Sequence, residues 1–230
     1  MIRAGAKWLA AGFGVAAAAY AAYVGVTWFR YGNVAPPAAE DEDPLLDHFF
    51  PAYEIVERHQ IRVAAPAAVT LDAARDVDLQ ASPLVRTIIR AREVILRATP
   101  DDRRRPRGLL AETQALGWGV LADVPEREVV VGAVTRPWEA NVTFHSLPPD
   151  QFAEFKEAGY VKIAWTIRAE PITASESIFR TETRAIATDP TARTKFRRYW
   201  SFLSPGIIVI RWALLGPVKK EAERRAREAR

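Results

Sequence analysis

The sequence predicts an α+β domain in which a curved antiparallel sheet wraps around a long C-terminal helix, preceded by an N-terminal transmembrane helix. Three features predict this arrangement: an uncharged stretch near the start, strand-like alternation through the middle, and an apolar helical stripe after the last strand. The chain has 230 residues, of which 49% are hydrophobic and 26% charged. This composition is globular, and the length suits one substantial domain with an appendage.

Composition excludes several classes of site. The sequence has no cysteine, which rules out disulfides, thiolate metal sites and thiol nucleophiles, and only three histidines, so we expect no metal and no cofactor. The net charge of +4 comes from an arginine run at 103–105 and a basic tail after Lys219. No nucleic-acid recognition motif accompanies it, and we expect no nucleic-acid partner. Neither HExxH, GxSxG nor a glycine-rich phosphate loop occurs, so the sequence assigns no catalytic residue.

Residues 8–29 form the predicted membrane span. They are 22 residues without a charge, which at ~1.5 Å per residue cross a hydrocarbon layer of about 30 Å. Trp8 and Trp28 flank the stretch as interfacial anchors do. A cleaved signal peptide and a buried helix are the alternatives, but a signal has a shorter apolar region and a buried helix needs no aromatic residues at both ends. We expect residues 1–30 to anchor the chain in a membrane.

Charges on the two sides of the span predict its orientation. Arg3 and Lys7 precede it, and acidic residues 40–43 follow it. The positive-inside rule therefore places the domain on the extracytoplasmic side of a single-pass protein, although Arg30 weakens this prediction. Residues 31–51 are predicted to be a polar, proline-bearing linker, with the apolar stretch 45–50 lying on the domain or on the membrane.

The first half of the domain reads as one strand and two short helices. Residues 53–64 alternate as a strand, with His59 on its apolar face. Pro66 opens a short helix through Ala74, and Ser82 followed by proline starts another. Residues 99–108 are predicted to be a charged surface loop.

Four further strands are predicted at 116–124, 128–135, 141–147 and 160–169, with a hairpin at 125–127 and a short helix within 148–158. The last strand covers 177–188 and leads into the long helix. Asp189 followed by Pro190 is a helix-start signal, and Pro205 with Gly206 should kink the helix. We expect the domain to cover 52–217 and a charged, solvated tail to cover 218–230; contact of that tail with anionic lipid is a weaker possibility.

This order of elements resembles the START-like helix-grip (SRPBCC) superfamily, which includes birch-pollen-allergen-like proteins, lipid-transfer START domains and polyketide cyclases. The residues that carry the resemblance are 61–78 (IRVAAPAAVTLDAARDVD) and 181–206 (TETRAIATDPTARTKFRRYWSFLSPG). More narrowly, the chain looks like uncharacterised bacterial SRPBCC-type proteins. The resemblance covers roughly 52–215, and the chain departs from better-studied members in its membrane span and its insertion near Arg103.

The resemblance implies an apolar cavity between sheet and helix that holds a hydrophobic or lipid-like small molecule. Residues expected to line it are His59, Ile61, Trp118, Phe144, Ile163, Trp165, Phe179, Thr181, Tyr199 and Leu203. The alternative is that all of these are core residues. His59 stands out as a titratable group on an apolar face, suited to act as a general base or to anchor a ligand oxygen; a core histidine is the more common situation.

Arg180, Glu182 and Arg184 share one strand face. They either form a polar cluster in the cavity or a solvated ladder on the outer face, and we expect the ladder because burying three charges is costly. Three functions follow as hypotheses: a membrane-anchored binder of a hydrophobic molecule, a polyketide cyclase- or dehydratase-like enzyme that uses His59 with Arg180 or Glu182, and a structural protein with a filled core.

Overall fold

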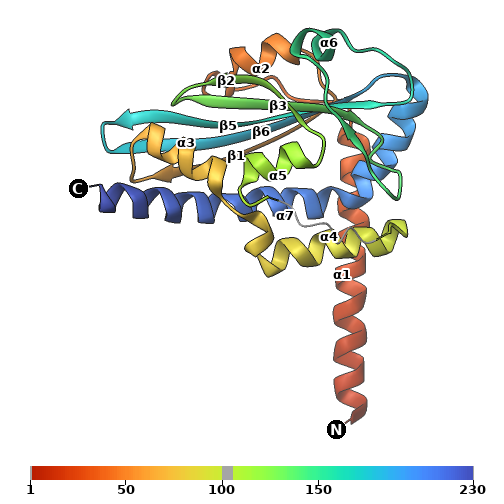
Figure 1. Ribbon diagram of the computed structural model, residues 1–230. Helices are drawn as coiled ribbons and strands as arrows, with labels where there is room; N and C mark the ends of the chain where they lie inside the picture. The colour runs from red at the N-terminus through yellow and green to blue at the C-terminus, as the bar shows by residue number, and fades with distance from the viewer. Residues whose placement is uncertain (1, 100–105, 230) are drawn as a thin grey trace.

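The computed structural model describes residues 2–99 and 106–229, with side chains from Gly12 onward except that of Phe13. Trp8, Arg3 and Lys7 are therefore described by their backbone only, and the arginines at 103–105 lie outside the described residues. The expected α+β class is confirmed: an antiparallel sheet packs on a long C-terminal helix, as in a helix-grip fold (Figure 1).

The sheet has six strands in the order β1-β6-β5-β3-β2, with β4 paired to β3, and every pairing is antiparallel. The turn at 125–127 joins β2 to β3, as the sequence predicts, and β5 and β6 form the longest hairpin. The expected strand at 141–147 is reduced to two residues. The strands are β1 Ile55–Val63, β2 Gly119–Val124, β3 Glu128–Thr135, β4 Phe144–His145, β5 Val161–Thr173 and β6 Glu176–Ala187.

Helix starts follow the predicted caps. The Ser82 side chain accepts from the backbone N–H of Val85, and the Asp189 side chain accepts from those of Thr191 and Ala192. Helix α5 was not predicted, because its seven residues lack a side-chain cap. The helices are α1 Ile2–Arg30, η1 Ala39–Asp41, α2 Pro44–Phe49, α3 Ala67–Asp76, η2 Leu79–Ala81, α4 Pro83–Leu96, α5 Leu109–Ala115, α6 Pro149–Glu154 and α7 Pro190–Glu228.

Helix α7 lies along one face of the sheet, which we call the inner face (Figure 1). Trp165 and Phe179 of the sheet and Leu214 of α7 belong to one buried core cluster. The helix continues past Pro217, and Val218 and Ala222 are fully buried in the same cluster. Residues 218–222 are therefore part of the domain's core rather than a separate tail, because their apolar side chains continue the packed stripe of α7.

Helix α1 is a continuous helix that packs against α7. The Tyr20 hydroxyl donates to the carbonyl of Phe202 at 2.7 Å, and the hydroxyls of Tyr23 and Ser204 are 2.8 Å apart. Among the described residues, α7 is the one helix long and apolar enough to cross a membrane by length and composition. A helix that packs on a sheet passes the same test, so this is weak evidence for a membrane.

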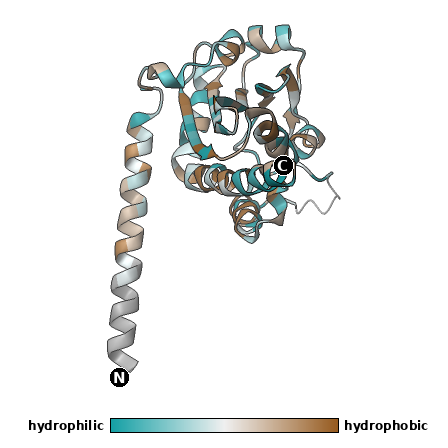
Figure 2. Cartoon of the chain, turned by 90° about the vertical axis from the view of Figure 1, so that its left-hand side faces the viewer, coloured by the Kyte–Doolittle hydropathy of each residue, from teal (hydrophilic) through white to brown (hydrophobic). Residues whose placement is uncertain are grey.

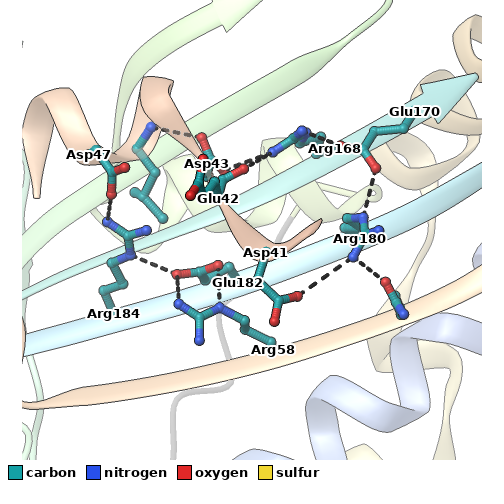
Figure 3. A network of polar contacts seen from close by, with 12 residues as sticks. Asp41, Glu42, Asp43, Asp47, Arg58, Arg168, Glu170, Arg180, Glu182 and Arg184 are labelled. Atoms are coloured by element: carbon teal, nitrogen blue, oxygen red, sulfur yellow. Dashed lines mark hydrogen bonds and ion pairs between the residues drawn. The ribbon is translucent and has the colours of Figure 1, made fainter. Parts of the chain in front are cut away.

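The outer face of the sheet is covered by residues 39–50, which we call the strap. It contains η1 and α2, and buries the side chains of Leu46 and Phe50. The strap is thus docked on the domain instead of being a free linker. Figure 3 shows its acidic residues meeting the arginines of β5 and β6. Arg168 donates to the carbonyl of Glu42 at 3.0 Å, and Arg180 lies 3.7 Å from Asp41.

The expected solvated ladder is on the outer face but is not solvated. Arg184 is 1% exposed; its guanidinium donates to Glu182 at 2.7 Å and to the carbonyl of Phe50 at 2.9 Å, and it pairs with Asp47. Glu182 in turn accepts from Arg58 at 2.8 Å. The sequence argument failed because it ignored the acidic strap, which supplies the partners that make burial of these charges tolerable.

Replacing Arg184 by alanine should lower the free energy of unfolding by roughly 3 kcal/mol, because it leaves buried acceptors without their donor. The matched control is Arg193→Ala. Its ion pair with Glu54 is made by a side chain that is 52% exposed, so its loss should cost less than roughly 1 kcal/mol. Denaturant unfolding of both variants checks this, and equal losses would contradict the structural role of the strap.

Candidate functional site

Polar side chains gather on the inner face where β1, β6 and α7 meet. We call Glu57, His59, Thr181, Thr183 and Arg211 the inner polar cluster. The sheet register places His59 opposite Thr181 and Glu57 opposite Thr183. Period-two alternation turns all four toward α7, which contributes Arg211. The sequence therefore builds the cluster from two paired strands and one helix.

Three polar atoms of this cluster are buried without a hydrogen-bond partner: Nε2 of His59 and the Oγ1 atoms of Thr181 and Thr183. Buried polar groups in native proteins are nearly always paired, because an unpaired one loses its hydration without compensation. Three such atoms on neighbouring positions of one sheet face indicate a place that takes a partner from outside the chain.

His59 is neutral in this setting. Burial and the positive charge of Arg211 lower the pKa of His59 below its usual 6.5. Its Nε2 lies 3.9 Å from Oε2 of Glu57, but a neutral imidazole makes no ion pair. Burial also raises the pKa of Glu57. The His59 ring packs at 5.8 Å against that of Trp212.

Arg211 supplies the positive charge of the site. Its guanidinium lies 4.7 Å from the centre of the Trp165 ring. In the part of the chain that the structure describes, no carboxylate or carbonyl accepts from it. A half-buried arginine without an anion, beside unpaired hydroxyls and a neutral imidazole, suits a ligand with an anionic or strongly polar head.

The predicted lining residues fall into separate groups. His59, Thr181 and Trp165 come together at the inner polar cluster. Trp118 packs on Trp165 with ring centres 6.3 Å apart, and Phe144 stacks on Trp118 at 4.8 Å. Phe179 is fully buried in the same core cluster, against which Ile61 packs.

Tyr199 lies at the other end of the domain. It stacks on Phe196 at 6.2 Å, and its hydroxyl accepts from Arg92 at 3.3 Å. Ile163 packs beside it in a further cluster, and Leu203 is half-buried on α7. These residues do not reach the inner polar cluster. An apolar cavity that joins all the predicted residues remains a prediction.

Sequence reasoning missed three members of the inner polar cluster, Glu57, Thr183 and Arg211, and the neighbouring Trp212. A signal for Arg211 existed, because it is a charged residue inside the apolar part of the long helix. Only the packing of α7 on the sheet shows which strand residues it faces.

A pocket of about 260 Å³ lies on the outer face, between strap and sheet. Its charged side chains are already paired with one another: Arg58 with Glu182, and Arg180 with Glu170 at 2.7 Å. His59 and Thr181 also border this pocket. Along β6, Arg180 and Glu182 alternate with Thr181, which is opposite His59 in the register, so their side chains point to the other face of the sheet from the His59 side chain. The hypothesis that His59 acts together with either of them stays a prediction, which this alternation disfavours.

Next to this pocket is a buried acid, Glu128. Burial and the neighbouring Asp43 carboxylate raise the pKa of Glu128 far above its ordinary 4.5, although Arg168 opposes the shift. Both of its carboxyl oxygens are buried without a donor. Glu128 is therefore protonated at neutral pH.

Stability should consequently fall as pH rises above about 4.5, because the folded chain holds the Glu128 proton more tightly than the unfolded chain. Glu128→Gln should remove this contribution. The variant should match the wild type near pH 4 and be more stable at pH 8 in denaturant unfolding. Parallel pH profiles for the two proteins would show that Glu128 does not hold a proton.

Thr181→Val should stabilise the apo protein by about 1 kcal/mol, because it removes a buried hydroxyl that has no partner. The matched control is Thr135→Val. The Thr135 hydroxyl is also buried, but it donates to the carbonyl of Thr143 at 2.8 Å, so this change should destabilise by about 1 kcal/mol. Equal losses in both variants, measured by thermal unfolding after ligand removal, would mean that Thr181 is satisfied within the chain.

Comparison with known proteins finds distant structural neighbours. No protein-family model matches the chain, and no curated protein matches its sequence. Solved structures do resemble it, and these neighbours are SRPBCC or START-like proteins. A norcoclaurine synthase mutant from Thalictrum flavum, in complex with a transition-state analogue, is 10% identical with a TM-score of 0.36, covering 74% of this chain and 95% of that one.

Two further neighbours are similarly distant. The Zhui aromatase/cyclase from Streptomyces sp. R1128 is 15% identical with a TM-score of 0.30, covering 76% of this chain and 97% of that one. A START superfamily protein from Mycobacterium smegmatis is 12% identical with a TM-score of 0.28, and the match covers 76% of this chain and 99% of that one. At identities and TM-scores this low, the activity of a neighbour cannot be transferred to this chain.

Proposed function

We propose that this protein is a membrane-anchored helix-grip domain that binds a lipid-like small molecule between the inner face of its sheet and α7. The observation that carries the proposal is the inner polar cluster, with the unpaired atoms of His59, Thr181 and Thr183 beside the unpaired Arg211. An amphipathic ligand satisfies both parts of this region, since its head meets the cluster and its apolar part meets the neighbouring aromatic side chains.

The chemistry of the cluster selects the head group. The guanidinium of Arg211 favours a carboxylate or a phosphate, which it binds through two parallel hydrogen bonds. The Thr181 and Thr183 hydroxyls donate or accept, and neutral His59 adds a further donor or acceptor. Trp165 and Trp118 offer the large apolar surfaces on which a hydrocarbon or ring system packs.

The membrane anchor is α1. Residues 8–29 carry no charge, and the helix is long enough to cross a bilayer. Apolar side chains on it face away from the protein: Val15 is 71% exposed and Phe29 is 77% exposed. The placement of Arg3 and Lys7 before the span puts the domain on the extracytoplasmic side. An anchor of this kind keeps the binding domain where lipid-like ligands are concentrated.

A cyclase-like enzyme is the second candidate, and one observation favours it. His59 is neutral, and its free Nε2 lies 3.9 Å from the Glu57 carboxylate. A neutral imidazole held beside a carboxylate can accept a proton from a bound substrate. If the protein is such an enzyme, His59→Gln should abolish turnover of the bound molecule while leaving its binding nearly intact. Loss of binding in that variant would make His59 a ligand contact instead.

Mass spectrometry of organic extracts tests the proposed binding. The full chain, purified gently from membranes, should release an acidic or phosphorylated amphiphile in amounts close to one per protein. Arg211→Gln should lose it, because the head group loses its counter-charge. Arg227→Gln is the matched control, as it removes an exposed arginine from the same helix and should retain the ligand.

Circular dichroism and thermal unfolding must first show that both variants fold. Ligand retained in Arg211→Gln would contradict the assigned head-group contact. An extract without ligand from the folded wild type would contradict binding and favour the structural protein with a filled core.

A further inference from the structure

The contacts between α1 and α7 fix how deep the domain lies in a membrane. Tyr20 bonds to Phe202 and Tyr23 to Ser204, and both tyrosines are inside the predicted span 8–29. Tyr20 comes nine residues before Phe29, which corresponds to about 13 Å along the helix. Helix α7 near Phe202 therefore lies beside the apolar part of α1 that is predicted to meet lipid.

Helix α7 carries apolar side chains that the described residues leave exposed. Phe202 is 47% exposed, Val209 is 38% exposed and Trp212 is 64% exposed. The spacing of seven residues keeps Phe202 and Val209 on one side of the helix. Exposed Arg198 precedes this stretch and exposed Lys220 follows it, so cations border the apolar surface at both ends.

Helix α4 extends the surface. Its Ile88 contacts α7 at Gly206, while Leu84 is 52% exposed, Val94 is 77% exposed and Ile95 is 62% exposed. Arg86 and Arg90 are exposed on the same helix, and Arg97 is exposed just after its C-terminal end. A helix that carries both exposed apolar side chains and exposed arginines suits the interface of an anionic membrane.

Helices α4 and α7 lie on the side of the domain from which α1 extends. Figure 1 shows α1 leaving the domain on the side where α4 and α7 lie, and running transverse to both. Figures 1 and 2 both show α1 continuing beyond α4 toward the N-terminus, with the sheet on the other side of α7. The exposed apolar side chains of α4 and α7 are thus on the part of the domain nearest the anchor's lipid-facing half.

We propose that α4 and the exposed stripe of α7 form a bilayer-contacting surface that lies in the membrane interface beside α1, with its arginines on anionic lipid head groups. The α4–α7 surface consists of Leu84, Val94, Ile95, Phe202, Val209 and Trp212. Exposed apolar patches of this kind are usually interaction sites. Lipid around the proposed anchor α1 would lie next to this patch, so we infer that lipid is the partner. The inference rests on the anchoring proposed above.

The same arrangement places the ligand site at the membrane. Trp212 of the α4–α7 surface contacts His59, and Arg211 precedes it on the helix. A lipid-like molecule that leaves the bilayer beside Trp212 therefore reaches the inner polar cluster without crossing water.

Single-cysteine labelling tests the surface, since the chain has no cysteine of its own. An environment-sensitive fluorophore is attached to Val94→Cys, Val209→Cys, Val15→Cys in the anchor, or Asp150→Cys on α6. The full chain is reconstituted in phosphatidylcholine–phosphatidylglycerol vesicles with or without lipids that carry a nitroxide near the head group. The α4 and α7 labels should show blue-shifted emission and quenching, and the label on α6, across the sheet, should show neither.

The anchor label separates the two proposals. A blue shift of the Val15 label, with the Val94 and Val209 labels behaving like the Asp150 label, would overturn the α4–α7 surface and leave the anchor intact. No blue shift of the Val15 label would overturn the anchor and this surface together. Arg90→Glu, combined with the Val94→Cys label, should reduce quenching in anionic vesicles but not in pure phosphatidylcholine. Equal quenching in both would overturn the contribution of the arginines.

Discussion

The ion pairs on the outer face of the sheet hold the rest of the structure in place. If nothing covered this face, the side chains of Arg58, Arg168, Arg180 and Arg184 would make it charged and exposed to solvent. The acidic strap covers it, and Arg184 alone joins Glu182, Asp47 and the carbonyl of Phe50. The strap follows α1 in the sequence after residues 31–38, so the same pairs hold this part of the chain against the sheet.

The two faces of the sheet differ in how their polar groups are satisfied. On the outer face most charged side chains of the strap and strands are paired with one another, Glu128 being an exception, and these pairs hold the strap on the sheet. On the inner face, His59, Thr181, Thr183 and Arg211 remain unpaired within the described chain. Leaving polar groups unpaired costs stability, and proteins accept that cost mainly at functional sites. This contrast is the physical reason for assigning ligand binding to the inner face.

Local signals in the sequence predicted much of the fold. The Ser82 and Asp189 caps, the hairpin at 125–127 and the faces of β1 and β6 all depend on neighbours in sequence, and the structure agrees with each. The strap, the burial of Arg184 and the role of Arg211 could not be predicted, because each depends on elements more than a hundred residues apart. His59 was found from its place on an apolar face, whereas Arg211 needed the packing of α7 on that face.

A crystal structure of the full chain, purified from membranes without ligand removal, tests the central claim most directly. The account predicts an elongated molecule between the sheet and α7, with its polar end within hydrogen-bond distance of His59 Nε2, Thr181 Oγ1 and the Arg211 guanidinium. A structure in which these groups are paired only with one another or with ordered water, and no ligand lies on the inner face, would contradict it.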